Sequence, residues 1–180
     1  MPKKPALLII DVQHALCTGD EAAFDIDAVV DRINSVAAKA RAAGAPVIYI
    51  QHESDGALQV GTGGWQLYER LAVRPEDLRV RKTGSDSFHG TELQALLRAQ
   101  DVDSLVVCGL QSEFCVDSTV RRALALGYPV TLVADGHSTV ANGILSAAQI
   151  SAHHNYTLTN IGSYGPRAEA IVAADVSMEP

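Results

Sequence analysis

Cys115 is the side chain of this sequence best placed for nucleophilic chemistry. A short apolar run at 105–108 predicts a buried strand, and Gly109 ends it. Apolar residues then recur at helical spacing over 116–127, so the cysteine lies in the first turn of a predicted helix. A helix N-terminus carries about half a positive charge and unpaired N–H groups, which stabilise a thiolate. This position predicts an activated thiol.

Charged and polar side chains follow the other predicted strands and could act together with this thiol. They are Asp11, His52, Lys82, Asp135 and His137. The carboxyl ends of parallel strands meet at one edge of a sheet, where ligands bind. A neighbouring aspartate would take the thiol proton and later pass it to a leaving amine. An ammonium, together with the helix N-terminus, would lower the thiol pKa from about 8.5 to roughly 3.5–7.5.

Each of these residues also has a purely structural explanation when it is taken alone. Cys115 can be a small buried residue, Asp11 can cap a turn, and Lys82 can be a solvated surface lysine. Cys108 falls inside a predicted strand and is expected in the core. Cys17 falls in a predicted loop near the cleft, where it could act as a resolving thiol.

Buried strands and amphipathic helices alternate along the chain, and these elements must position the polar side chains. Strands are predicted at 6–10, 47–50, 78–82, 105–108, 129–134 and 156–158. Helices are predicted at 27–41, 65–71, 116–127 and 144–153, from a capping box at Thr91 and Gln94, and after Pro166. The alternation predicts a parallel sheet covered on both faces, as in doubly wound α/β proteins.

The composition indicates a compact globular protein. The chain has 180 residues, 14 basic and 21 acidic, and we expect a single domain over 1–180. Without a large basic cluster, nucleic-acid and anionic-membrane binding are not expected, and apolar runs stay well below the ~20 residues of a membrane span. The start of the chain leads into a strand rather than a signal peptide. Three cysteines without a disulfide pattern favour the cytoplasm.

The sequence around Cys115 resembles the signature of the isochorismatase-like cysteine hydrolases. The pattern G-x-x-[ST]-x-x-C-V…T…A…L-G-Y matches 109–116, Thr119, Ala123 and 126–128. The D-x-Q element of the family matches 11–13. The stretch with Lys82, Ser87, Phe88, Thr91 and Leu93 resembles its K…S-x-F…T-x-L segment, and a further feature matches 134–136. The resemblance covers essentially the whole chain in the right order.

The resemblance implies a three-layer α/β/α Rossmann-like sandwich with a six-stranded, mainly parallel sheet. It implies a catalytic triad of Asp11, Lys82 and Cys115. It also implies a cis peptide bond between Leu110 and Gln111, and an oxyanion hole made by the backbone N–H groups of Gln111 and Cys115. Relatives commonly form dimers or tetramers, so a homo-oligomer is expected.

The sequence departs from the metal-containing nicotinamidases of this family, which carry a D-x-H motif after the second strand. Residues 51–53 read Gln-His-Glu instead, so we expect no metal. No cofactor is expected either, because the glycine-rich nucleotide-binding motifs are missing. We expect His52, Trp65 and Phe88 to line the substrate pocket, although Trp65 fits ordinary packing equally well.

Three functional hypotheses follow. The favoured one is a cysteine hydrolase that cleaves the C–N bond of a small amide, carbamoyl or ureido substrate through a thioester. The namesake reaction of the family, hydration of a vinyl ether, can proceed without the cysteine, so the presence of Cys115 favours amide hydrolysis. The alternatives are an isochorismatase-type enol-ether hydrolase with Asp11 as general acid, and a non-catalytic binding or redox protein with an oxidisable thiol.

Overall fold

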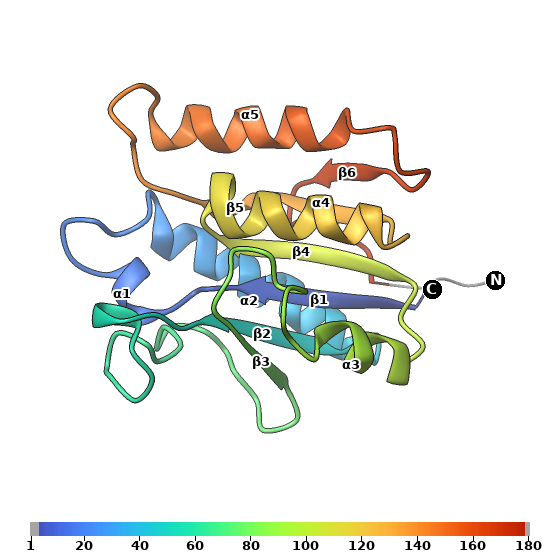
Figure 1. Cartoon of the computed structure of the whole chain (residues 1–180), viewed down its shortest axis with the longest axis horizontal. Coiled ribbons are helices and arrows are strands. Elements are labelled where there is room, and N and C mark those ends of the chain that lie inside the picture. Colours follow the sequence, from blue (N-terminus) through green and yellow to red (C-terminus); the bar gives the residue numbers. More distant parts are fainter. Residues whose placement is uncertain (1–3, 179–180) are drawn as a thin grey trace.

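The structure is a computed structural model that describes residues 4–178, and it contains a six-stranded sheet (Figure 1). All paired strands are parallel, in the order β3-β2-β1-β4-β5-β6. The strands are β1 (Pro5–Ile10), β2 (Val47–His52), β3 (Leu78–Lys82), β4 (Ser104–Leu110), β5 (Val130–Ser138) and β6 (Ala168–Ile171). This arrangement confirms the predicted α/β fold with a parallel sheet.

Helices cover both faces of the sheet and make it the middle layer of three. They are α1 (His14–Cys17), α2 (Ile26–Ala42), the 3₁₀ turn η1 (Gly56–Leu58), α3 (Leu93–Ala99), the π-helical turn η2 (Ser112–Val116), α4 (Asp117–Ala125) and α5 (Ala147–Thr159). In Figure 1, α2 lies behind the sheet, and α3 and α4 lie in front of it. In the described part of the chain, each helix is too short or too polar to cross a membrane.

The two faces of the sheet bury separate hydrophobic clusters, and β1 shows why. Leu7 and Ile9 pack with α2, whereas Leu8 and Ile10 pack with α3 and α4. Successive side chains of a strand point to opposite faces, so a strand covered on both sides must be apolar throughout. The continuous apolar runs of the sequence are the consequence of this double burial.

The last two predicted elements are wrong. Residues 156–158 lie inside α5, the last strand is β6, and Pro166 precedes this strand instead of opening a helix. Local strand propensity at 156–158 is overridden by packing, because Leu158 is fully buried two helical turns after Ile150. The helix begins in a capping box between Ser146 and Gln149.

Three smaller predictions are also wrong. Residues 65–71 form turns instead of a helix, and Leu67 bridges to Gln13. The N-cap of α3 is Glu92 and Thr91 accepts from the amide of Leu93 instead of Gln94, so the predicted capping box does not form. Cys17 is buried in α1 rather than placed in a loop.

Gly109, near the end of β4, sets the distance between the central strands. Its φ is +116°, and a Cβ atom there would lie 2.1 Å from the carbonyl oxygen of Ile10. Only glycine allows this close approach of two backbones. The end of β4 is therefore held against the end of β1, which places the turn that carries Cys115 beside Asp11.

Candidate active site

The ammonium of Lys82 lies at the centre of a group of polar atoms at the carboxyl ends of the strands. Its Nζ atom is 2.6 Å from Oδ2 of Asp11, 3.2 Å from Sγ of Cys115 and 3.1 Å from Nδ1 of His52. It also donates to the carbonyl of Gly84 at 3.1 Å. Lys82 is only 2% exposed, so it is not a solvated surface lysine. The structure thus brings together the three residues of the predicted triad and His52.

Asp11 directly follows β1 and presents one bonded and one free carboxylate oxygen. Its φ of +51° lies in the left-handed region, which Asp tolerates better than most residues. Oδ2 accepts from Lys82, whereas Oδ1 is buried and accepts no hydrogen bond from residues 4–178. Burial raises the pKa of Asp11, and the Lys82 ammonium and the Cys115 thiol oppose this rise. The Oδ1 atom can therefore accept a proton or a hydrogen bond.

Cys115 lies in the π-helical turn η2 and not in the first turn of an α-helix. Burial, followed by the negative charge of Asp11, raises the pKa of the Cys115 thiol to about 12, and Lys82 opposes this rise. The prediction of a lowered thiol pKa is therefore wrong for the free site. It placed the cysteine at a helix N-terminus, but α4 begins only at Asp117, and it did not include burial. The resting residue is a thiol.

His52, at the end of β2, is half-buried beside the ammonium. Burial, and next the positive charge of Lys82, lower the pKa of His52, so its imidazole is neutral. Because an ammonium can only donate, Nδ1 is the unprotonated acceptor in this pair. A ligand atom of Cys115, one of Asp11 and one of His52 lie within 4.8 Å of one another.

These three residue types are ligands that zinc accepts. However, Lys82 contacts all three of them, so a metal ion would have to displace an ammonium from its hydrogen bonds. The geometry is that of a site built around the cation of a lysine.

Gln13 fixes the backbone around this site, a role that sequence reasoning missed. Its side chain accepts from the amide of His52 at 2.8 Å, and its amide nitrogen donates to the carbonyls of His52 and Trp65. The residue is fully buried just after β1. The D-x-Q pattern pointed to this residue, but only the folded chain shows that it ties β1 to the end of β2.

The two predicted aromatic pocket residues have different surroundings. Trp65 has its carbonyl held by Gln13 and Gln51, and the guanidinium of Arg81 lies 5.7 Å from the centre of its ring. Phe88 is 8% exposed, and its ring stacks on Tyr128 at 6.2 Å in the cluster beneath α3 and α4. A contact of either ring with substrate stays a prediction.

A second, uncharged group of side chains lies on the other side of Cys115. Ser112 Oγ is 2.7 Å from Nδ1 of His137 and 3.0 Å from Oγ of Ser151. Nε2 of His137 is 3.0 Å from Oδ1 of Asn155, whose amide nitrogen donates to the carbonyl of Ala134. This last bond fixes the amide orientation, so His137 donates through Nε2 and accepts the Ser112 hydroxyl through Nδ1.

The prediction that Asp135 and His137 follow the fifth strand is wrong, because β5 continues to Ser138. The imidazole of His137 is buried against Ser112, and burial lowers its pKa. The carboxylate of Asp135 accepts from the amide of Ala173 and pairs with Arg32. Neither side chain joins the ammonium group of the triad.

The turn before Cys115 has the backbone form that the resemblance implies. The peptide bond between Leu110 and Gln111 is cis. The carbonyl of Gln111 accepts from the amides of Phe114 and Val116, which closes the turn. An oxyanion hole formed by the N–H groups of Gln111 and Cys115 stays a prediction.

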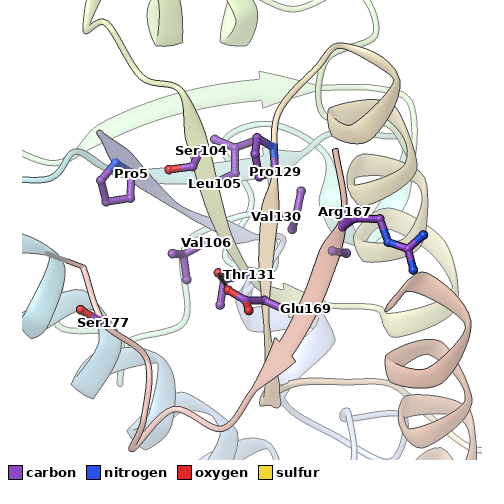
Figure 2. A pocket seen from close by; sticks show the side chains of 11 residues that line it. Pro5, Ser104, Leu105, Val106, Pro129, Val130, Thr131, Arg167, Glu169 and Ser177 are labelled. Carbon is purple, nitrogen blue, oxygen red and sulfur yellow. Dashed lines mark hydrogen bonds between the residues drawn. The ribbon is translucent and has the colours of Figure 1, made fainter. Parts of the chain in front are cut away.

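A cavity of about 380 Å³ lies at the opposite edge of the sheet (Figure 2). The first residues of β1, β4, β5 and β6 line it, among them Pro5, Ser104, Val130 and Ala168. Arg167 extends from its rim and donates to the carbonyl of Thr159 in α5. Because the strands are parallel, this cavity and the triad lie at opposite ends of the same strands, and no triad residue lines it.

The profile of the isochorismatase domain matches residues 5–159. A streptothricin hydrolase of Streptomyces noursei is 39% identical over 175 residues, which are 92% of this chain and 63% of that protein. The chain therefore spans less than two thirds of the length of that relative. A ureidoacrylate amidohydrolase of Caulobacter vibrioides is 30% identical over 172 residues, which are 74% of this chain and 76% of that protein.

A crystal structure of an isochorismatase family protein superimposes on this fold with a TM-score of 0.86. It is 38% identical to this chain, and the match covers 94% of this chain and 98% of the other. The sheet and its covering helices are therefore those of this family.

Proposed function

Because the chain belongs to the isochorismatase family, we propose that it hydrolyses the C–N bond of a small amide, carbamoyl or ureido compound through a thioester on Cys115. One observation carries the proposal: the Lys82 ammonium bonds both the Asp11 carboxylate and the Cys115 sulfur. Two relatives, named streptothricin hydrolase and ureidoacrylate amidohydrolase, support a hydrolase of this type.

Acylation begins with transfer of the thiol proton of Cys115 to Asp11. The free Oδ1 atom can receive this proton, because it is buried without a partner in the described chain. As the proton leaves, sulfur attacks the carbonyl carbon, a C–S bond forms, and the carbonyl oxygen takes the negative charge. The N–H groups of Gln111 and Cys115 would bind this oxyanion. When the C–N bond breaks, Asp11 returns the proton to the departing nitrogen.

Deacylation reverses these roles. Asp11 accepts a proton from water, the hydroxyl attacks the thioester, and the C–S bond breaks with its electron pair on sulfur. The thiolate of Cys115 then recovers the proton from Asp11, and the acid leaves. Lys82 neither gains nor loses a proton, and its charge stabilises whichever of the two neighbours is anionic.

The pKa values of the pair fit a transfer that accompanies attack. Burial raises the pKa of Asp11, which makes the carboxylate a stronger base than an exposed aspartate. Burial and Asp11 raise the pKa of Cys115 to about 12, so free thiolate does not accumulate before substrate binds. We infer that sulfur loses its proton as it forms the bond to carbon.

The test is a panel of amides, ureido acids and carbamoyl compounds assayed with wild type and the Cys115→Ala variant. We expect the variant to lose turnover and the acyl-enzyme mass adduct. Cys17→Ala is the matched control, because it removes a buried thiol from α1 and should leave turnover unchanged. Full activity of Cys115→Ala on amides would exclude the thioester route.

A second function, hydrolysis of an enol ether with Asp11 as general acid, is favoured by one observation. Burial raises the pKa of Asp11, which helps a carboxyl group to hold and donate a proton. In that case, Cys115→Ala would still cleave isochorismate while neither protein cleaves amides. The third hypothesis, a redox thiol, loses support because oxidation-sensitive cysteines have a low pKa, and burial raises that of Cys115.

A further inference from the structure

The Lys82 ammonium has more hydrogen-bond acceptors around it than hydrogens to donate. Four acceptor atoms lie within 3.2 Å of its Nζ atom: Oδ2 of Asp11, the carbonyl oxygen of Gly84, Nδ1 of His52 and Sγ of Cys115. An ammonium has three hydrogens. One of the four acceptors must therefore go without a full hydrogen bond at any moment.

In the thiol form of Cys115, the acceptor that goes without is sulfur. A thiol is a weak acceptor, and its own hydrogen has the free Oδ1 of Asp11 as a destination. The three hydrogens of Lys82 then serve Asp11, Gly84 and His52. Every strong acceptor in the group is satisfied, so this is the resting arrangement.

In the thiolate form, sulfur becomes a strong, charged acceptor and needs a hydrogen from Lys82. Asp11 keeps its bond because Oδ2 is the nearest atom, at 2.6 Å, and Gly84 keeps its bond because a backbone carbonyl cannot turn away. The neutral Nδ1 of His52 is the acceptor that can be released. His52 is half-buried, so water or a substrate N–H can replace the lost bond.

We infer that His52 is a positioning residue that competes with the sulfur of Cys115 for one hydrogen of the Lys82 ammonium. His52 thereby holds the nucleophile in the thiol form until a donor on the substrate occupies Nδ1 and frees that hydrogen. The inference deepens the proposed function and rests on Cys115 as its nucleophile. It gives His52 a role through Lys82 in addition to its predicted place in the pocket.

Several charged groups affect the pKa values of His52 and Cys115. His52 senses Lys82, Asp11 and Glu53, and Cys115 senses Asp11 and Lys82. A substitution at position 52 that changes no charge leaves all of these in place. A neutral side chain is therefore the correct replacement for the neutral imidazole.

The experiment measures the rate of Cys115 alkylation by iodoacetamide against pH in wild type, His52→Leu and His52→Asn. Peptide mass analysis assigns the label to Cys115 rather than to the buried Cys17 and Cys108. Leu removes the acceptor, so we expect alkylation at pH 8 about tenfold faster than in wild type, with the profile displaced to lower pH. Asn offers an oxygen close to the Nδ1 position and should keep the wild-type profile.

Equal rates in wild type and His52→Leu would overturn the inference, because no hydrogen would have been released to sulfur. Slower alkylation in His52→Leu would also overturn it and would identify His52 as a base for the thiol. The measurement needs no substrate, so it stays separate from the proposed function. If wild type cleaves none of the amides but His52→Leu is alkylated faster as expected, the proposed amide hydrolysis is rejected and the role of His52 is retained.

Nitrogen-15 NMR of the imidazole tests the same point in the native side chain if His52→Leu fails to fold. We expect an unprotonated Nδ1 at neutral pH, whose resonance moves as Cys115 ionises and stays fixed in Cys115→Ser. A protonated Nδ1 in the resting protein would overturn the inference, because such an atom cannot accept from Lys82.

Discussion

The two flanks of Cys115 use opposite chemistry. On the side of β1, β2 and β3 lie a carboxylate, an ammonium and an imidazole in direct contact. On the side of β5 and α5, uncharged hydroxyl, imidazole and amide groups form one directional chain from Ser151 to Asn155, and the nearby carboxylates of Glu113 and Asp117 are bonded to Thr139 and His154. The first flank places a carboxylate, an ammonium and a thiol in contact, whereas the uncharged chain of the second flank holds the turn η2 in place. The proposed reaction and the support of η2 are thus separated across the sheet.

His52 and His137 show the same difference between the two flanks. Both accept through Nδ1 and have their pKa lowered first by burial. His52 accepts from an ammonium and is half-open to solvent, so its hydrogen bond can be exchanged. His137 is 3% exposed and has a partner on each ring nitrogen, so water has little access to replace its bonds.

Asp11→Asn should give the largest effect and would separate proton transfer from thiol ionisation. Turnover of the amide substrate should fall by about 10²–10⁴-fold, because the acid–base group is gone. Alkylation of Cys115 should nevertheless become faster, because the negative charge of Asp11 raises the thiol pKa in wild type. Turnover of the amide substrate checks the loss of proton transfer, and the rate of iodoacetamide labelling checks the change in thiol ionisation.

Asp135→Asn is the control for Asp11→Asn, because it removes a carboxylate on the β5 side that touches Arg32 and Ala173. It should leave the alkylation profile of Cys115 unchanged. Slower labelling of Cys115 in Asp11→Asn would contradict the electrostatic assignment of the charged flank.

Ser112→Ala should give a smaller effect of a different kind. It removes the hydroxyl that joins His137 to Ser151, and we expect kcat to fall about tenfold as the turn loses its support. The alkylation profile of Cys115 should not move, because no charge changes. Ser112→Thr keeps the hydroxyl and should restore kcat. A displaced alkylation profile in Ser112→Ala would contradict this comparison, because it would show that the β5 and α5 flank also affects the ionisation of Cys115.

The smallest expected effect is on stability against pH. Burial lowers the pKa of His137 in the folded protein, so the unfolded chain binds more protons once the pH falls below about 6.5. Folding stability should therefore decrease as the pH falls through this range, by about 1 kcal/mol. His137→Asn should reduce this dependence in urea unfolding between pH 7 and 5.5, and the remainder is expected from His52, whose pKa is also lowered by burial. An unchanged slope would show that His137 is not the group responsible.

The charged flank could be predicted from the sequence, and the neutral flank could not. Asp11 and His52 follow short apolar runs, Lys82 ends a strand in which arginine alternates with apolar residues, and parallel strands bring such positions to one edge. His137 was assigned to this edge because β5 was predicted too short. Asn155 lay beyond the predicted end of its helix, and no motif connects Ser151 with a strand more than a dozen residues away.

The pKa of the Cys115 thiol could not be predicted from the sequence for a different reason. A sequence gives the types of charge near Cys115 but not the degree of burial, and burial is the first cause of the raised value. The π-helical form of η2 was also unreadable, because the apolar spacing after 116 fits an ordinary α-helix. The role of Gln13 required the folded backbone for the same reason: its partners are main-chain atoms of His52 and Trp65, which carry no residue-specific signal.

The contact between Gly109 and Ile10 has a consequence for how such a protein can diversify. It holds the end of β1, which Asp11 follows, close to the end of β4, which leads into the turn with Cys115. The long connection between β2 and β3 lies outside this contact, so insertions and exchanges there can remodel the pocket without altering it. One glycine would thus let substrate preference change between descendants while the proposed reaction is inherited unchanged.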